Sequence, residues 1–266
     1  MEDKKKRRNT AKQKNTVKRK RKRRNQQKTD VISITILIVA VCVFVFSLYQ
    51  LAMLLVPYYF GRQEYDEVKK LVITTEKTAE GEEKFQVDFE ALQEENSDTV
   101  AWIRFDEPAV INYPVVKGMD NDLYLTKTFS ASDNKLGAIF MDYRNASSFS
   151  DRNTIIYGHN LKVGGEMFSQ LNAYGDEAFY KEHPYFYIYT PDGKTRTYQV
   201  FVAGVVSDQA ENYTLEFESD ERYLAYLEAC KNSSAYQTDA SVGAGSSIVT
   251  LSTCTNVRDD ERFIVQ

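Results

Sequence analysis

The twenty residues that decide the fold read SIVTLSTCTNVRDDERFIVQ and occupy positions 247–266. Their β-branched, apolar start over residues 248–251 predicts a buried strand, and a second apolar strand opens with Arg262. The first strand delivers Cys254 where polar residues take over. A thiol at the end of one strand and a guanidinium at the start of the next put a nucleophile beside a fixed cation. That pairing favours the thiolate and can stabilise an oxyanion.

The region before this stretch reads mostly as short strands bounded by turn residues, of which Pro191-Asp-Gly193 is the clearest. Short strands without alternating helices predict a mostly β fold, namely a closed eight-stranded barrel rather than a doubly wound sheet. The eight strands are expected over residues 100–105, 110–116, 138–141, 154–157, 185–190, 196–206, 247–252 and 262–265.

Two helices are expected beside the strands. Apolar residues recur at i, i+4 and i+7 over residues 219–232, ending at Cys230, and Ser219 or Asp220 supplies the cap. This helix falls between the sixth and seventh strands. A shorter N-terminal helix, capped by Asp88, is expected before the first strand.

Charge divides the chain sharply. Of its 34 basic and 38 acidic side chains, 15 and 3 fall within residues 1–30, which leaves 19 basic and 35 acidic residues beyond them. A basic tail on an acidic body indicates contact with nucleic acid or with a membrane surface. Residues 31–56 carry no charge and exceed the ~20 apolar residues that span a bilayer. We therefore expect a single transmembrane anchor, with the tail on anionic lipid rather than on nucleic acid.

The anchor reads as uncleaved, because it is longer than the ~7–15-residue apolar core of a signal peptide and leaves through the bulky Pro57-Tyr-Tyr-Phe60. The positive-inside rule places residues 1–30 in the cytoplasm and everything after the anchor outside the cell membrane. We expect a juxtamembrane stalk over residues 57–84, partly helical or disordered, and one extracellular domain over residues 85–266.

The chain has three cysteines, and their positions decide whether a disulfide is expected. Cys42 lies in the anchor, whereas Cys230 and Cys254 lie outside, where disulfides form and a bond between the two is the plainest alternative. Cys230 falls on the apolar face of a helix, where a free thiol behaves as a small hydrophobe. One exposed cysteine with a histidine elsewhere is the pattern of a nucleophile, so we favour a free Cys254.

The chain has two histidines that could assist this thiol. His159 follows an expected strand and a glycine, a position that matches that of Cys254, whereas His183 lies in a polar loop and reads as a surface residue. Histidine supplies the proton that a leaving amine needs near neutral pH. Of the two candidate cations, Arg262 at a strand start is held more rigidly than Arg258 in the loop, as oxyanion stabilisation requires.

Three segments resemble the signature of sortases, the cysteine transpeptidases of Gram-positive cell surfaces. They are Thr250-Leu-Ser-Thr-Cys254, Tyr157-Gly-His-Asn160 and the following Arg262. Also similar are Asn112-Tyr-Pro-Val-Val116, Asp120-Asn-Asp-Leu-Tyr-Leu125 and Trp102-Ile103. The resemblance covers residues 86–266 and the layout of the anchor. The helix over residues 219–232 and the helical segment before the first strand resemble class B sortases in particular.

The resemblance implies a role for each of three residues. Cys254 attacks the scissile Thr carbonyl of a sorting signal, which in class B is of the Asn-Pro-x-Thr type; His159 is the general acid and base, and Arg262 supports substrate and oxyanion. The implied partners are a surface protein bearing that signal and a peptidoglycan amine. Carried over by position, the residues of the substrate groove are Asn121, Leu125, Tyr157, Tyr213, Ser252 and Thr255.

Two other functions stay open from the residues alone. A hydrolytic cysteine protease would use the same three residues with water as acceptor, and a tethered β-barrel binding module would merely bury Cys254. The three-part constellation argues against the module, while the sequence does not separate transfer from hydrolysis. No Cys/His cluster has zinc-like spacing and no glycine-rich phosphate loop is visible, so we expect neither a metal site nor a cofactor.

Overall fold

The computed structural model describes residues 2–77, 83–108, 111–161 and 164–266. The chain divides into two compact units, Met1–Val56 and Pro57–Gln266. The first unit is helical and belongs to α1 (Glu2–Val72). Among the described residues, one helical segment, Asp30–Val72, is long and apolar enough to cross a membrane. It includes the expected anchor.

The second unit is built on a mixed sheet of nine strands in the order β8-β7-β3-β4-β5-β6-β10-β11-β9. Neighbours are antiparallel, except that β4 runs parallel to β5 and β6 runs parallel to β10. The strands are β3 (Thr99–Phe105), β4 (Asn112–Val116), β5 (Ile139–Met141), β6 (Asn153–Tyr157), β7 (Tyr185–Tyr189), β8 (Thr195–Gln199), β9 (Ala203–Ser207), β10 (Ile248–Cys254) and β11 (Glu261–Val265).

The expected single strand over residues 196–206 is wrong, because that segment forms two strands at opposite edges of the sheet. Val200, Phe201 and Val202 are all buried, but they lie between the two strands and outside both ladders. The chain instead rounds the end of the sheet, where the backbone nitrogens of residues 201 and 202 donate to Gln266 O. No glycine, proline or asparagine marks this break, so the sequence carried no turn signal.

The sheet is strongly curled. Its two edge strands, β8 and β9, are joined by three residues, which bridge at most about 14 Å. Nine strands laid flat would separate the same edges by about 38 Å, at about 4.8 Å per strand. Within the described residues no ladder of hydrogen bonds joins β8 to β9. The mostly β architecture is confirmed, and the sheet forms a curled half-barrel in place of the closed eight-stranded barrel that we expected.

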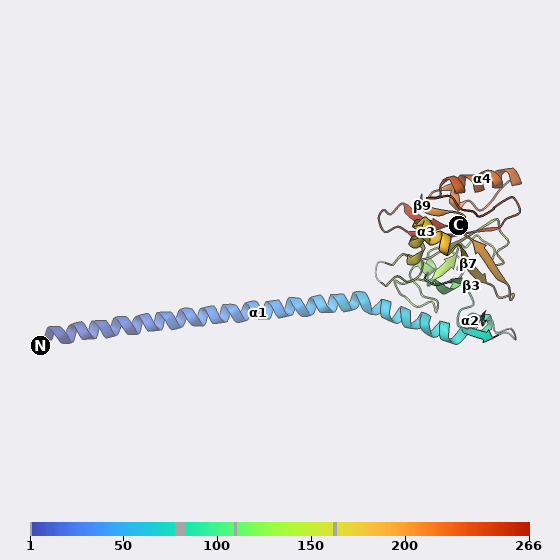
Figure 1. Cartoon of the computed structure of the whole chain (residues 1–266). Coiled ribbons are helices and arrows are strands. Elements are labelled where there is room, and N and C mark those ends of the chain that lie inside the picture. The colour runs from blue at the N-terminus through green and yellow to red at the C-terminus, as the bar shows by residue number, and fades with distance from the viewer. Residues whose placement is uncertain (1, 78–82, 109–110, 162–163) are drawn as a thin grey trace. The chain divides into compact units, whose positions relative to one another are not determined.

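Both expected helices are confirmed. In α2 (Phe89–Glu95) the Asp88 carboxylate accepts a hydrogen bond from Ala91 N at 3.0 Å, and in α4 (Asp220–Asn232) the Ser219 hydroxyl accepts one from Arg222 N at 3.2 Å. The two helices lie at opposite ends of the second unit (Figure 1). The remaining short elements are α3 (Glu177–Glu182), η1 (Leu123–Leu125), η2 (Ser169–Gly175) and η3 (Glu211–Tyr213).

The segment that we expected to be a stalk contributes to the folded unit instead. In the last turns of α1, Tyr65, Val68 and Val72 are buried in the main apolar core. Their spacing of i, i+3 and i+7 forms one helical face, which the many charged residues between them obscure in the sequence. The chain then pairs β1 (Ile73–Lys77) with β2 (Glu83–Val87). Residues 78–82 of the expected stalk lie outside the described residues.

The buried side chain of Asn153 joins the connection between β9 and α4 to the sheet through hydrogen bonds. Asn153 Nδ2 donates to Thr214 O at 2.9 Å and to Tyr226 Oη at 3.0 Å, while its Oδ1 accepts from Thr250 Oγ1 at 2.7 Å. Asn153 is fully buried at the start of β6. Because each partner is itself buried or partly buried, the side chain of Asn153 fixes a segment that has little regular structure of its own.

Replacing Asn153 with Leu should therefore destabilise the fold by about 2–4 kcal/mol, because the buried partners lose their hydrogen bonds and cannot reach water. Urea unfolding of the full-length chain in detergent, followed by tryptophan fluorescence, measures the change. The exposed Asn172 is the matched control, and Asn172→Ala should change stability by no more than about 0.5 kcal/mol. Equal losses from the two variants would contradict the assignment.

Candidate active site

One face of four adjacent strands carries the candidate site. In the antiparallel pair of β10 and β11, Cys254 lies directly opposite Arg262, and directly opposite residues share a face of the sheet. Ser252 lies two residues before Cys254, hence on the same face, and pairs with Tyr157 of β6. Tyr157 in turn pairs with Phe140 of β5. Strand alternation thus gathers five side chains on one surface.

Because β6 and β10 run parallel, both strands end on the same side of the sheet. His159, which follows β6, therefore lies near Cys254 at the end of β10. Just beyond β6, Gly158 N donates to Ser252 O at 3.1 Å. Asn160 Nδ2 donates to Cys254 O at 2.7 Å. The residues on both sides of His159 are therefore tied to the strand that ends in the thiol.

A hollow of about 260 Å³ opens over this face. The structure places all three predicted catalytic residues, Cys254, His159 and Arg262, in its lining. Four of the six predicted groove residues line it as well. The full lining is Asn121, Leu125, Phe140, Tyr157, Gly158, His159, Ser252, Thr253, Cys254 and Arg262.

The His159 ring is held from two sides. Its Nε2 lies 2.7 Å from Leu125 O, and because a carbonyl only accepts, Nε2 carries the proton. In the neutral ring this leaves Nδ1 as the nitrogen without a proton. On the other side lies Gly137, where a Cβ would stand 2.6 Å from Cδ2 and 2.8 Å from Nε2 of the ring. Its φ of +65° also favours glycine. Without a Cβ, the backbone of Gly137 can lie directly against the imidazole.

The two candidate arginines differ in how they are held. Arg262 Nη1 donates to the backbone carbonyls of Asp259 and Glu261 at 2.7 and 2.9 Å, and 26% of its side chain is exposed. Arg258 is 64% exposed, makes two hydrogen bonds with Asp260 and does not line the hollow. Arg262 is thus held by the backbone and faces the hollow, whereas Arg258 is held by an exposed side chain outside it.

A buried carboxylate organises one wall of the hollow. Asp142 accepts two hydrogen bonds of 2.8 Å from the Arg144 guanidinium and one of 3.0 Å each from Asn121 Nδ2 and Tyr157 Oη. Burial alone would raise the pKa of Asp142, but the hydrogen bonds from these three side chains and from Arg144 N outweigh burial, and the pKa lies below its ordinary value. Asn121 also accepts from Tyr143 N at 3.0 Å. Its amide is therefore held by this network.

Tyr213 lies in a neighbouring hollow of about 620 Å³, which shares Tyr157, Ser252 and Arg262 with the first. Its hydroxyl lies 2.7 Å from Ser252 Oγ. Burial raises the pKa of Tyr213 to about 12, so the hydroxyl keeps its proton at neutral pH. We call these two hollows, which share three lining residues, the groove.

Three other residues considered in the sequence lie apart from this groove. Thr255 is not in the lining of either hollow, and its Oγ1 accepts from Val257 N at 3.2 Å within the loop between β10 and β11. His183 ends α3 as its cap. Cys230 is buried in α4 and, like Cys254, is a free thiol, which excludes the alternative disulfide.

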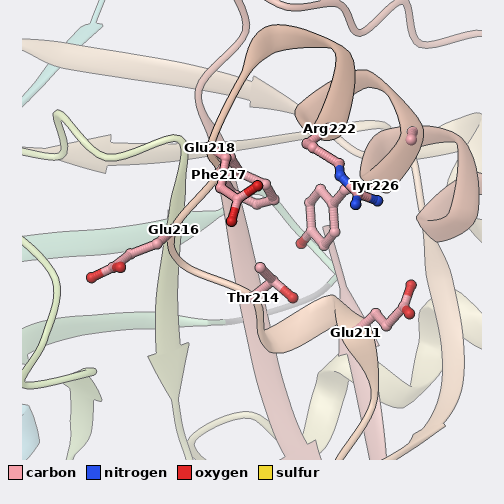
Figure 2. Close-up of a pocket in the computed structure, with 8 residues that line it drawn as sticks. Glu211, Thr214, Glu216, Phe217, Glu218, Arg222 and Tyr226 are labelled. Carbon is pink, nitrogen blue, oxygen red and sulfur yellow. The ribbon is translucent and has the colours of Figure 1, made fainter.

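A further hollow of about 350 Å³ lies beside α4 and contains none of the predicted site residues. Figure 2 shows Tyr226 projecting from α4 toward the segment that carries Thr214 and Phe217, with Arg222 beside the Tyr226 ring. Three glutamates also line this hollow. Among the residues that the structure describes, no group of three or more His, Cys, Asp or Glu side chains could hold a metal ion.

Sequence reasoning missed the supporting residues Asp142, Gly137 and Asn160. Asp142 stands directly after the apolar strand β5, the same kind of position that identified His159 and Cys254, so one signal was present. Gly137 gave none, because the need for glycine arises from a ring that is distant in the sequence.

The two thiols of the second unit should react very differently. Burial raises the pKa of Cys230 to about 11, so its thiolate fraction at pH 8 is roughly one part in a thousand, while Cys254 is exposed. Brief alkylation of the folded full-length chain at pH 8, followed by peptide mass mapping, should label Cys254 and leave Cys230 unlabelled. Labelling of Cys230 should grow as the pH approaches its raised pKa. Equal labelling of both thiols in the folded chain would contradict this assignment; equal labelling after unfolding is the control.

The Sortase domain family model matches residues 107–266 of the chain. Two curated relatives are named Sortase B. The protein of Listeria monocytogenes is 32% identical over 233 residues, which cover 86% of this chain and 93% of that protein. The protein of Staphylococcus aureus is 34% identical over 173 residues, which cover 65% and 70% respectively.

Solved structures agree with these relatives. Sortase B from Bacillus anthracis is 35% identical with a TM-score of 0.68, and the match covers 79% of this chain and 96% of that one. A Staphylococcus aureus sortase B-substrate complex is 32% identical with a TM-score of 0.62, covering 66% and 82%. The chain therefore belongs to the sortase family, and the proteins and structures that it resembles are class B sortases.

Proposed function

We propose that this chain cleaves a C-terminal sorting signal of the Asn-Pro-x-Thr type after its Thr and transfers the surface protein to a peptidoglycan amine. The observation that carries the proposal is that Cys254, His159 and Arg262 line one hollow at the ends of three adjacent strands. Sortases are cysteine transpeptidases, so the family supports the reaction class.

In the first step the Cys254 sulfur, as thiolate, attacks the Thr carbonyl carbon and forms a C–S bond. The tetrahedral intermediate places negative charge on the former carbonyl oxygen, beside the Arg262 guanidinium, which stabilises it. When the C–N bond breaks, protonated His159 gives its proton to the leaving amine, and a thioester to the Thr remains.

In the second step an amine attacks the thioester, and His159 takes up the proton that this amine loses. The C–S bond then breaks and the Cys254 thiolate leaves, so the proton and the thiolate return to their starting places. Because the two hollows of the groove share Ser252, Tyr157 and Arg262, together they offer length for an extended peptide. In this reading the groove side chains that contact the signal are Leu125, Tyr157, Tyr213 and Ser252, with Asn121 as a support.

We place the reaction at the outer face of the cell membrane. The candidate span includes the uncharged residues 31–56, and the basic tail of residues 1–30 precedes it. The positive-inside rule then keeps the tail on anionic lipid in the cytoplasm and puts the second unit outside. That side holds both proposed substrates, the surface protein and the peptidoglycan amine.

The deciding experiment incubates the full-length chain in detergent with a peptide that contains Asn-Pro-Gln-Thr, with and without an added amine. Mass spectrometry should find cleavage after Thr and an amine-linked product, both absent in Cys254→Ala. Cys230→Ala is the matched control and should retain activity, since that thiol is buried packing. Hydrolysed product alone, even with excess amine, would replace the transpeptidase with a protease. Cleavage by Cys254→Ala would reject the site.

A second test separates the two arginines. Arg262→Ala should lower kcat by about 10²–10³, the loss typical of one oxyanion donor. Arg262→Lys should recover little, because a flexible ammonium does not reproduce the planar guanidinium. Arg258→Ala should act weakly, because that side chain is exposed and paired with Asp260. The same peptide assay measures all three variants, and a reversed order of the two alanine variants would assign the oxyanion to Arg258.

A further inference from the structure

The last turns of α1, residues 57–72, bind two loops that lie against His159, namely the loop before β5 and the loop that follows His159 itself. On the loop before β5, Ser130 N donates to Glu64 Oε1 at 2.9 Å, and Asn134 Nδ2 donates to Pro57 O at 2.7 Å. The loop that follows His159 is held through an ion pair with Arg62, whose partner is Glu166. This part of α1 is thus more than a connection to the apolar span.

Tyr65 makes the most deeply buried of these contacts. Its side chain is 2% exposed and its ring packs edge-on against Tyr113, with 5.3 Å between centroids. The hydroxyl donates to Gly137 O at 2.8 Å and accepts from Phe129 N at 3.1 Å. Burial holds the pKa of Tyr65 well above its ordinary value, so this hydroxyl stays protonated and remains a donor. One oxygen therefore joins both ends of the loop 129–137.

Gly137 transmits this contact directly to the imidazole. Its backbone lies against the ring, since an added Cβ would stand 2.6 Å from His159 Cδ2 and 3.0 Å from Leu125 O. Leu125 O is the acceptor of the His159 Nε2 proton. A shift of Gly137 would consequently change both the surface on which the ring rests and the spacing to its hydrogen-bond acceptor.

We propose that Tyr65 is a positioning residue for His159: its hydroxyl fixes Gly137 behind the imidazole and so keeps the ring proton on Nε2 and Nδ1 free for exchange. The effect on turnover rests on the proposed function, because only there does His159 transfer protons. The effect on the ring itself does not. Tyr65 touches no substrate and acts through Gly137.

The matched control is a second buried tyrosine. Tyr174 is fully buried, and its hydroxyl also donates to a backbone carbonyl, that of His183, at 2.8 Å. Tyr174 does not line the active-site hollow. Tyr65→Phe and Tyr174→Phe remove the same group and leave the same ring, so any general cost of losing a buried hydroxyl falls on both.

Kinetics of the full-length chain in detergent give the first readout, with the Asn-Pro-Gln-Thr peptide and an added amine. Tyr65→Phe should lower kcat about tenfold, because small misplacements of a catalytic group are costly, and should leave KM within about twofold. Tyr174→Phe should leave both constants within about twofold. Thermal unfolding of the two variants shows that both fold. A kcat of Tyr65→Phe within about twofold of the unmodified chain, or equal losses from both variants, would overturn the proposal.

The second readout is the nitrogen spectrum of the histidine rings in the same chain, labelled with ¹⁵N-histidine. The chain has two histidines, so His183 serves as an internal reference. The unmodified chain should show the Nε2-protonated tautomer for His159. Tyr65→Phe should move those signals toward a mixture of tautomers and leave His183 unchanged. His159 signals identical in both proteins would overturn the proposal. Absence of turnover in the unmodified chain would reject the proposed function, and these spectra would still decide the positioning claim.

Discussion

The arrangement of the site depends on the parallel pairing of β6 with β10. Parallel neighbours end on the same side of a sheet, so residues that follow the two strands meet even though α3, α4 and three other strands lie between them in the sequence. His159 follows β6, and Cys254 ends β10. The antiparallel strand β11 then sets Arg262 opposite the thiol. Two ladders of backbone hydrogen bonds thus determine how His159, Cys254 and Arg262 lie relative to one another.

Two buried polar side chains hold the segments beside these strands through hydrogen bonds. Asp142 binds Asn121 and Tyr157 on one wall of the groove, while Asn153 binds the connection that carries Tyr213 toward the other. A polar side chain whose hydrogen bonds are all satisfied rigidifies its surroundings, because any movement leaves a buried group unpaired. Hydrogen bonding by these two side chains therefore adds to apolar packing in holding the groove walls.

The sequence predicted what depends on local pattern and missed what depends on distant contacts. The strand ends identified Cys254 and His159, because a reactive side chain directly after an apolar run is a local signal. Residues 196–206 read as one strand, since only the rest of the sheet requires the chain to turn there. The place of Tyr65 in the core was hidden for the same reason, as its partners on the loop before β5 lie far along the chain. Thr255 was carried over by position alone, and no pattern in its own surroundings tested it.

Arg262 differs from the other arginines near the site in how strongly its charge is paired, which bears on its proposed role beside the oxyanion. Arg144 is bound by two short hydrogen bonds to the buried Asp142, and Arg258 is likewise paired with a carboxylate, so either would have to break a charged pair to serve an anion. The ion pair of Arg262 is longer, with its Nη2 3.8 Å from the Asp208 carboxylate. A pair so long and partly exposed contributes little, at most about 1 kcal/mol. In the proposed reaction, Arg262 would therefore exchange this weak partner for a developing oxyanion at small cost, while Nη1 stays anchored on backbone carbonyls.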